Sequence, residues 1–155
     1  MEQTLIIFKP DSLNRGLVGE ILHRFERKGL KLVAMKMIYL DDDILGSHYF
    51  HLKDKAFFPV LKRFMSSAPS LVAVLEGVNA VEVVRFLVGS TKGYEADAGT
   101  IRGDYSISSQ CNVVHASDSK VNANIEIYRF FKEDEIFSYD KIDLDFIYSE
   151  DEIEK

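Results

Sequence analysis

The chain has 155 residues, of which 46% are hydrophobic and 28% charged, so it is expected to bury one core as a single globular domain. No apolar run approaches the roughly 20 residues of a membrane span, and the start Met1-Glu2-Gln3 lacks the basic residues of a signal peptide. The single cysteine, Cys111, excludes an internal disulfide framework, and no dense basic stripe of the kind found in duplex DNA binders is present. We therefore expect a cytoplasmic protein that associates with no membrane and has no sequence-specific nucleic-acid partner.

The acidic residues are concentrated towards the C-terminus. Residues 132–155 contain ten Asp or Glu and three Lys, a net charge of −7, which leaves +1 for residues 1–131 out of the total of −6. An anionic ligand would therefore need basic residues close to its own site. We expect residues 1–148 to form the domain and residues 149–155 to form a solvated acidic tail.

The first half of the chain is predicted to contain two strands and three helices. Pro10 ends the first apolar run, so a loop is expected from there to Gly16, and Gly29 is expected just after the next helix. The predicted elements are a strand at 4–8, a helix at 17–28, a strand at 30–40, a helix that Asp41 to Asp43 cap and that runs to Leu52, and a helix at 57–65.

The second half alternates strands and helices around one long irregular loop. We predict a strand at 70–75, a helix at 80–88 capped by Asn79 and ended by Gly89, a loop at 90–104, a short strand at 112–115 and a final helix. Apolar stripes are expected to turn these two helices towards the core: Ala80, Val83, Val84 and Leu87 in one, and Val121, Ile125 and Tyr128 in the other. The order of elements favours an α/β (α+β) sandwich of the ferredoxin-like, split βαβ type, with a four-stranded antiparallel sheet covered by helices.

His115 lies at the end of the predicted strand that contains Val113 and Val114, and a polar run that can start a helix follows it. Backbone N–H groups and the helix dipole favour anions at such a position, which suits a nucleophile that faces a phosphate. A lone histidine at a strand end is more often structural. Whether other residues of the chain can form a phosphate site around His115 distinguishes the two interpretations.

Phosphate-binding residues would have to be scattered, because the Walker A spacing is absent: Gly89-Ser-Thr-Lys92-Gly93 has similar letters in the wrong order. Arg85 interrupts an apolar run, and a guanidinium beside a buried face usually has a specific anionic partner. Arg102 is flanked by Gly99 and Gly103, which allow tight turns around a ligand. Taken alone, each of the candidates is more often an ordinary surface residue; together they are Lys9, Arg85, Thr91 and Arg102.

Glu126 interrupts the apolar patch Ile125-Glu-Ile127 on the final helix. The simpler interpretation is a charge at the border of the helix. In the functional interpretation, its carboxylate accepts a hydrogen bond from the imidazole of His115, fixes the tautomer and leaves the other ring nitrogen free to attack.

Several motifs, taken together and in chain order, resemble the nucleoside diphosphate kinase family from about residue 2 to residue 148. Each motif is weak alone, whereas their order and spacing make the set highly specific. The motifs are Lys9-Pro10-Asp11, Arg15-Gly16-Leu17-Val18-Gly19-Glu20, Arg24-Phe25-Glu26, His48-Tyr49, Phe57-Phe58-Pro59, Gly99-Thr-Ile-Arg-Gly-Asp104 and Asn112-Val-Val-His-Ala-Ser-Asp-Ser119.

The resemblance implies transfer of a γ-phosphoryl group from a nucleoside triphosphate to a nucleoside diphosphate, such as ATP, GTP and their diphosphates, through a phosphohistidine and with low base specificity. His115 aligns with the nucleophile, Glu126 with its orienting carboxylate and Ser117 with a hydroxyl in the same network. Lys9, also counted as catalytic, aligns with the phosphate-site residues together with Tyr49, Arg85, Thr91 and Arg102. Asn112 aligns with the ribose contact, and Phe57 and Leu61 with the apolar pair that holds the base. Mg²⁺ is expected to arrive with the nucleotide, and Asp118 could reach a metal-bound water.

The chain departs from the family pattern at several places. Ala116 follows the histidine where glycine is usual, and the loop at 90–98 has Lys92-Gly93 and Ala98 where the family usually has an Asn-Pro pair and a proline. Because this loop contributes to trimer contacts in hexameric members, we expect a homo-oligomer built from dimers but leave hexamer and tetramer open.

Two other classes of function remain to be weighed against the enzyme. One is a nucleotide-binding or regulatory module on the same scaffold without turnover, which would need no nucleophile. The other is an interaction protein whose acidic tail recruits a partner, although such a charge run is usually just a solvated terminus.

Overall fold

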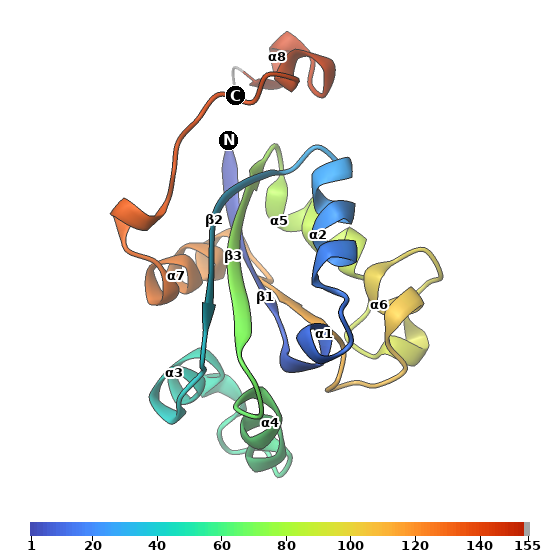
Figure 1. The fold of residues 1–155 in the computed structure, drawn as a ribbon, viewed down its shortest axis with the longest axis vertical. Helices are drawn as coiled ribbons and strands as arrows, with labels where there is room; N and C mark the ends of the chain where they lie inside the picture. Colours follow the sequence, from blue (N-terminus) through green and yellow to red (C-terminus); the bar gives the residue numbers. More distant parts are fainter. Residues whose placement is uncertain (154–155) are drawn as a thin grey trace.

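A four-stranded antiparallel sheet in the order β2-β3-β1-β4 organises the computed structural model, which describes residues 1–153 (Figure 1). The strands are β1 (Glu2–Phe8), β2 (Lys31–Ile38), β3 (Ser70–Gly77) and β4 (Val114–Ala116). All three strand pairs are antiparallel, and β4 is joined to the sheet by pairing with Ile6, Ile7 and Phe8 of β1. This sheet with its helical cover confirms the predicted fold class.

Helices cover both faces of the sheet, and the sheet separates two hydrophobic clusters. On one face, Leu5 and Ile7 of β1 pack with residues of α3 (Asp42–His48), α4 (Phe58–Met65) and α7 (Lys120–Phe130). On the other, Ile6 and Phe8 pack with residues of α2 (Val18–Arg27), α5 (Ala80–Val88) and α6 (Ile101–Tyr105). β1 is therefore buried on both sides, which explains its unbroken apolar run.

Local sequence signals set several helix ends. The Asp41 side chain accepts a hydrogen bond from the backbone N–H of Ile44 at 2.8 Å, so Asp41 caps α3 as predicted. Ser119 caps α7 in the same way, through the N–H of Asn122 at 3.2 Å. Gly29 adopts a φ of +103° just after α2 and terminates it, which also agrees with the prediction.

Two predicted loops contain short helices. Residues Pro10–Asn14 form α1, because proline fits the first turn of a helix as well as it ends a strand. In the loop predicted at 90–104, the segment Gly93–Glu95 forms the 3-10 helix η2, and α6 begins at Ile101. The Thr100 hydroxyl caps α6 by accepting from the N–H of Gly103 at 3.0 Å, and Ile101 is fully buried. The sequence signal for α6 consists of one cap and one buried residue, which is too little for a pattern of apolar spacing to reveal the helix.

The predicted inner face of α7 is wrong. Val121, Ile125 and Tyr128 are 69%, 52% and 67% exposed, whereas the buried residues of the helix are Ala123, Ile127 and Phe130. Both sets have the i, i+4, i+7 spacing, so the apolar pattern alone could not choose between the two faces.

The N-terminal end and the stripe of α5 also differ from expectation. Asn79 has a left-handed φ of +52° and makes no side-chain capping bond. Ala80 and Val84 are buried as predicted, but Val83 and Leu87 are only half-buried; the other buried positions are Val81 and Val88. The helix is apolar almost all round, so its orientation depends on the tertiary packing.

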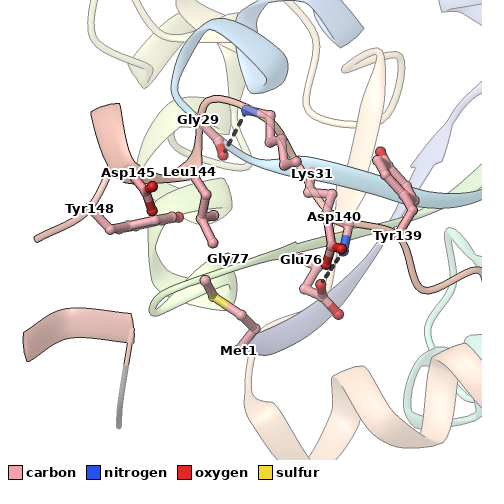
Figure 2. A pocket seen from close by; sticks show the side chains of 11 residues that line it. Met1, Gly29, Lys31, Glu76, Gly77, Tyr139, Asp140, Leu144, Asp145 and Tyr148 are labelled. Carbon is pink, nitrogen blue, oxygen red and sulfur yellow. Dashed lines mark hydrogen bonds and ion pairs between the residues drawn. The ribbon is translucent and has the colours of Figure 1, made fainter. Parts of the chain in front are cut away.

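After α7 the chain returns along the edge of β2 and closes over one end of the sheet, through η3 (Glu133–Glu135) and η4 (Leu144–Phe146). The Phe137 N–H donates to the carbonyl of Val33 at 2.9 Å, and the Val78 N–H donates to the Tyr148 hydroxyl at 3.2 Å. A cavity of about 310 Å³ lies beneath this segment (Figure 2). A Cβ on Gly29 would meet Ile147 at 2.7 Å, and one on Gly77 would meet the Tyr148 hydroxyl at 2.8 Å, so both glycines are needed for this close approach.

The packing of residues as far as Tyr148 supports our proposal that the domain comprises residues 1–148. Within the proposed tail, Glu150–Ile153 forms the short helix α8, whose acidic residues are exposed. The last two residues of the tail, 154–155, lie outside the described residues. None of the helices within residues 1–153 has the length and apolar character needed to span a bilayer.

Deleting residues 149–155 is expected to shift the melting temperature by no more than about 2 °C, because surface residues away from packed features contribute little to stability. A longer deletion that begins at residue 141 also removes Ile147 and Tyr148 and should lower the melting temperature clearly. Circular dichroism on heating provides the measurement for both. Equal destabilisation by the two deletions would show that the domain extends into the tail.

Candidate active site

A cavity of about 1,260 Å³ opens beside the end of β4 and is lined by every site residue predicted from the sequence except Ser117. Its walls come from α3 and the following 3-10 helix η1 (Phe50–Leu52), from α4, α5 and α6, and from α7. The lining residues among those predicted are Lys9, Tyr49, Phe57, Leu61, Arg85, Thr91, Arg102, Asn112, His115, Asp118 and Glu126. Residues far apart in the chain thus converge on one site large enough for a small-molecule ligand.

His115 is held on β4 by an unusual backbone turn. Val113 was predicted to lie within the strand, but it has a φ of +62° and the strand begins only at Val114. The N–H of Val114 donates to the carbonyl of Asn112 at 2.8 Å, which makes Val113 the centre of a tight γ-turn. A β-branched residue in this conformation is strained, and such strain is typically retained at functional sites.

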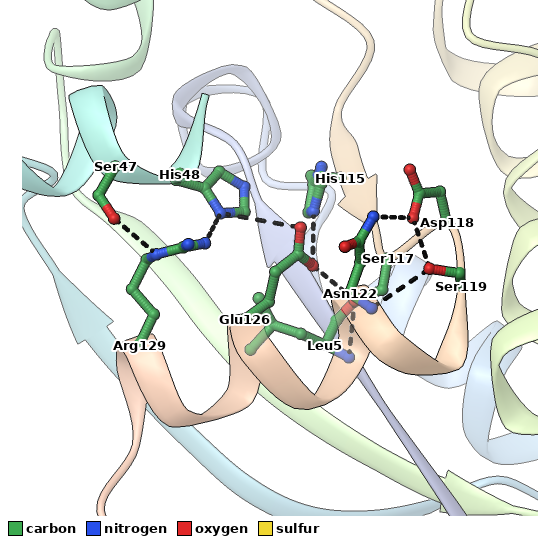
Figure 3. Close-up of polar contacts among 10 residues, drawn as sticks. All are labelled: Leu5, Ser47, His48, His115, Ser117, Asp118, Ser119, Asn122, Glu126 and Arg129. Atoms are coloured by element: carbon green, nitrogen blue, oxygen red, sulfur yellow. Dashed lines mark hydrogen bonds and ion pairs between the residues drawn. The ribbon is translucent and has the colours of Figure 1, made fainter. Parts of the chain in front are cut away.

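His115, Glu126 and Ser117 form one hydrogen-bonded group (Figure 3). Oε2 of Glu126 lies 3.1 Å from Nε2 of His115 and accepts a hydrogen bond from the Ser117 hydroxyl at 2.5 Å. Burial alone would raise the pKa of Glu126, but the hydrogen bonds from His115 and Ser117 outweigh burial and hold it below its usual value. An ionised Glu126 accepts the Nε2 proton of His115 and leaves a lone pair on Nδ1.

Two buried cations lie at the base of the cavity. Nζ of Lys9 donates to Oδ1 of Asn112 at 2.5 Å and to the carbonyl of Gln110 at 3.2 Å. Burial, together with the nearby charge of Arg102, lowers the pKa of Lys9 to about 8. Burial and the charge of Arg85 lower the pKa of Arg102 to about 10. Two positive charges that are buried close together repel each other, and an anionic ligand would relieve that repulsion.

Backbone carbonyl groups fix Arg102 at its position. Its Nη1 and Nη2 atoms donate to the carbonyls of Gly89 at 3.1 Å and of Val114 at 2.8 Å. Asn112 is buried, and its Nδ2 donates to the carbonyl of Thr91 at 2.7 Å. Arg85, in contrast, is exposed at the cavity rim rather than set against a buried face.

The mouth of the cavity is partly apolar. Phe57 is 42% exposed and stands just before α4, and Leu61 lies one turn later in that helix and is buried. Tyr49 is buried, and burial raises the pKa of its hydroxyl, which therefore stays protonated as a potential donor. Its Oη has no hydrogen-bond partner among the described residues.

The sequence interpretation assigned no role to His48 and Arg129, two further residues of this cavity. The His48 ring is buried and lies edge-on to that of His115, with ring centroids 4.6 Å apart. Arg129 follows Glu126 by three residues on α7, a spacing that places both on one face of the helix. For Arg129 that spacing was the available signal, and His48 stood out only within the motif His48-Tyr49, because the approach of α3 to α7 is a tertiary feature.

His48, His115 and Glu126 hold potential metal-ligating atoms within 4.8 Å of one another. Two nitrogens and one carboxylate suit Zn²⁺ better than Mg²⁺, which prefers oxygen ligands. However, the Arg129 guanidinium lies 3.2 Å from Nδ1 of His48, and its charge opposes a cation there. The carboxylate better suited to Mg²⁺ is Asp118, whose pKa is held low by a hydrogen bond from Asn122 at 2.6 Å.

Comparison with known proteins is consistent across sequence and structure. The family model for nucleoside diphosphate kinase matches residues 2–136. The chain is 56% identical over 152 residues to the nucleoside diphosphate kinase of Parabacteroides distasonis, covering 98% of this chain and 99% of the relative. It is 49% identical over 150 residues to that of Archaeoglobus fulgidus, covering 97% and 99%. A structure of the halophilic nucleoside diphosphate kinase from Halobacterium salinarum in complex with CDP superposes with a TM-score of 0.94 at 39% identity, covering 96% of this chain and 99% of the other.

Proposed function

The chain belongs to the nucleoside diphosphate kinase family, and from this premise we propose that His115 carries the phosphoryl group between the two nucleotides. The protein is a phosphotransferase that moves the γ-phosphoryl group of a nucleoside triphosphate to a nucleoside diphosphate by a ping-pong mechanism. This confirms the activity predicted from the resemblance. The roles of individual residues are the proposal.

The contact between Glu126 and His115 is the observation that carries the proposal. Because Nε2 of His115 is engaged by an ionised carboxylate at 3.1 Å, Nδ1 keeps its lone pair for the attack. In the first half-reaction Nδ1 bonds to the γ-phosphorus, the bond to the bridging oxygen breaks, and the nucleoside diphosphate leaves. In the second, an oxygen of the acceptor's terminal phosphate attacks the same phosphorus and the N–P bond breaks. Glu126 offsets the positive charge that the ring acquires each time, and Ser117 keeps the carboxylate in place.

Positive charge around the transferred group supports the same assignment. Lys9, Arg85 and Arg102 line one cavity with His115, and phosphoryl transfer depends mainly on positioning and on charge stabilisation of the phosphate oxygens. We propose that Tyr49 and Thr91 add neutral donors to this phosphate site. Asn112, whose Oδ1 accepts a hydrogen bond from Nζ of Lys9 at 2.5 Å, is proposed to contact the ribose, while Lys9 belongs to the phosphate site.

The base is proposed to lie between Phe57 and Leu61 at the mouth of the cavity. An aromatic face stacks on any base without reading its edges, so ATP and GTP should both serve as substrates. Mg²⁺ is proposed as the cofactor, arriving with the nucleotide phosphates and neutralising part of their charge. Asp118 is ionised and lines the cavity, so it fits a contact through metal-bound water.

Incubation of the protein with labelled ATP and Mg²⁺ tests the assignment directly. We expect a phosphorylated protein whose label is on His115, is labile in acid and is discharged by GDP as GTP. A coupled assay for ATP formation from ADP and GTP should show the same transfer in both directions. Nucleotide binding without any phosphorylated protein would instead favour a binding module without turnover.

The pH dependence of the catalytic efficiency should reveal Lys9. Its pKa is lowered to about 8, so in the free enzyme it loses its charge as the pH rises above that value. Because kcat/KM reports the ionisation of the free enzyme, it is expected to fall above about pH 8. Lys9→Met should be less efficient throughout and should lack this alkaline decline. An unchanged decline in Lys9→Met would assign it to another group.

We propose that the protein is cytoplasmic and assembles as a homo-oligomer, a hexamer or a tetramer, from dimers. β2 is an edge strand of the sheet, and its Met35 and Met37, with Tyr39 just beyond it, are 44%, 59% and 69% exposed. Exposed apolar side chains gathered in this way favour association with another chain. Light scattering coupled to size-exclusion chromatography measures the mass and so distinguishes a hexamer, a tetramer and a monomer.

A further inference from the structure

Arg129 makes two contacts that tie α7 to α3 beside the proposed catalytic group (Figure 3). Its Nε donates to the Ser47 hydroxyl at 3.0 Å, and its Nη1 lies 3.2 Å from Nδ1 of His48. A guanidinium group has only donors, so Nδ1 of His48 must be the acceptor. The proton of the neutral His48 ring is therefore on Nε2, a tautomer that follows from the identity of its partner.

His48 is surrounded by groups that its own charge would affect. The ionisable groups that face it are His115 on β4, Glu126 and Arg129 on α7, His51 on η1 and the adjacent Tyr49. Burial is the main reason that the pKa of His48 is lowered to about 3, and the charges of His115 and Arg129 act in the same direction. The ring is therefore neutral at physiological pH.

Glu126 lies between two histidines, and within residues 1–153 only one of its oxygens accepts hydrogen bonds. Oε2 serves both His115 and Ser117, whereas Oε1 is 3.9 Å from Nδ1 of His48, which is beyond hydrogen-bond distance. A His48 ring with a proton on Nδ1 could close that gap and donate to Oε1. It would then share the carboxylate on which His115 depends.

We propose that Arg129 is a positioning residue for phosphoryl transfer: by donating to Nδ1 of His48, it prevents His48 from donating to Glu126 and reserves that carboxylate for His115. The proposal rests on the proposed role of His115. Without Arg129, a His48–Glu126 pair would favour the charged form of His48, with its ring centroid 4.6 Å from that of His115. A positive charge there opposes the charge that His115 acquires during the attack, and it weakens Glu126 as an acceptor.

Nitrogen NMR of the native protein tests the first step without any reference to activity. In the intact chain, the His48 ring should show an unprotonated Nδ1 and a protonated Nε2 throughout the range from about pH 5 to 8, in which ordinary histidines titrate. A protonated Nδ1, or a His48 ring that titrates in this range, overturns the proposal. Because this measurement needs no turnover, it stands even if phosphorylation of His115 is not found.

The second step is tested by the pH profile of single-turnover phosphorylation by ATP in Arg129→Met and Arg129→Lys. In Arg129→Met we expect phosphorylation to be about three- to tenfold slower on the acidic side, to recover as the pH rises, and to leave the KM for ATP unchanged. The His48 resonances should begin to titrate in the same variant. Arg129→Lys keeps a cationic donor and should restore both properties, and Arg27→Met controls for the loss of one exposed arginine.

Three results would overturn the role of Arg129. A raised KM with an unchanged pH profile would assign Arg129 to direct nucleotide binding. A fall that is equal at every pH and accompanied by a lower melting temperature would show a merely structural tie between α7 and α3. A profile like that of the native protein, with His48 still untitrated, would show that Glu126 needs no such protection. If Arg129→Met does not fold, Arg129→Lys and the native tautomer decide the matter.

Discussion

Replacing His115 by alanine is expected to reduce phosphoryl transfer between nucleotides by at least about 10⁴-fold, since removing the nucleophile of a covalent mechanism has effects of this order. His48, whose ring centroid lies 4.6 Å from that of His115, cannot substitute, because its Nδ1 is occupied by Arg129 and its Nε2 carries the proton. The variant should also acquire no label from ATP. His115 is on the cavity wall and only half-buried, so the variant should fold normally.

Two companion variants make the result specific. His23→Ala removes an exposed histidine on α2 and should transfer phosphate at the native rate. Glu126→Gln keeps a hydrogen-bond acceptor but loses the charge, and it should slow phosphorylation of His115 without abolishing it, by about 10²-fold as for other groups that assist a catalytic proton or charge. Exchange of phosphate at the native rate by His115→Ala would eliminate the proposed nucleophile.

The sequence predicted those parts of the architecture that depend on local signals. The apolar run of β1, the cap at Asp41 and the glycine after α2 are local signals, and each has the predicted structural role. The face that α7 turns to the core is not a local property, since Ile125 and Ile127 both belong to stripes of helical spacing. The packing of the helix on β1 selects one stripe, and the other remains exposed.

The candidate site likewise contains residues that the sequence could identify and features that depend on the tertiary structure. The resemblance assigned site residues by alignment, and the structure brings all of these site residues except Ser117 to the wall of one cavity, with Ser117 hydrogen-bonded to Glu126. No motif selected Arg129, whose importance depends on the approach of His48 from another helix. Nor could the sequence predict the turn at Val113, because a valine with positive φ is contrary to its intrinsic preference. Such features result from tertiary constraints that the surrounding core imposes.

Arg102→Met is expected to affect stability and function together. The side chain is only 8% exposed, and its guanidinium satisfies the carbonyls of Gly89 and Val114 with charge-assisted hydrogen bonds. Removing it leaves those acceptors unpaired, which should lower the free energy of unfolding by about 2–4 kcal/mol. Urea denaturation measures this loss. Arg85→Met provides a matched control, because Arg85 is an exposed arginine of the same cavity and its loss should raise the KM for ATP with little change in stability.

Arg102→Met should also change the pKa of Lys9, and through it the pH dependence of catalysis. The charge of Arg102 is one of the causes, after burial, that lower the pKa of Lys9 to about 8. Without Arg102, Lys9 should keep its proton to higher pH, so the alkaline decline of kcat/KM should move upward even though efficiency is lower overall. An alkaline decline that stays in place in Arg102→Met would mean that the two cations do not interact across the site. In that case the phosphate site would be a set of independent charges, and the loss of efficiency in Arg102→Met would reflect only the missing cation and the unpaired carbonyls.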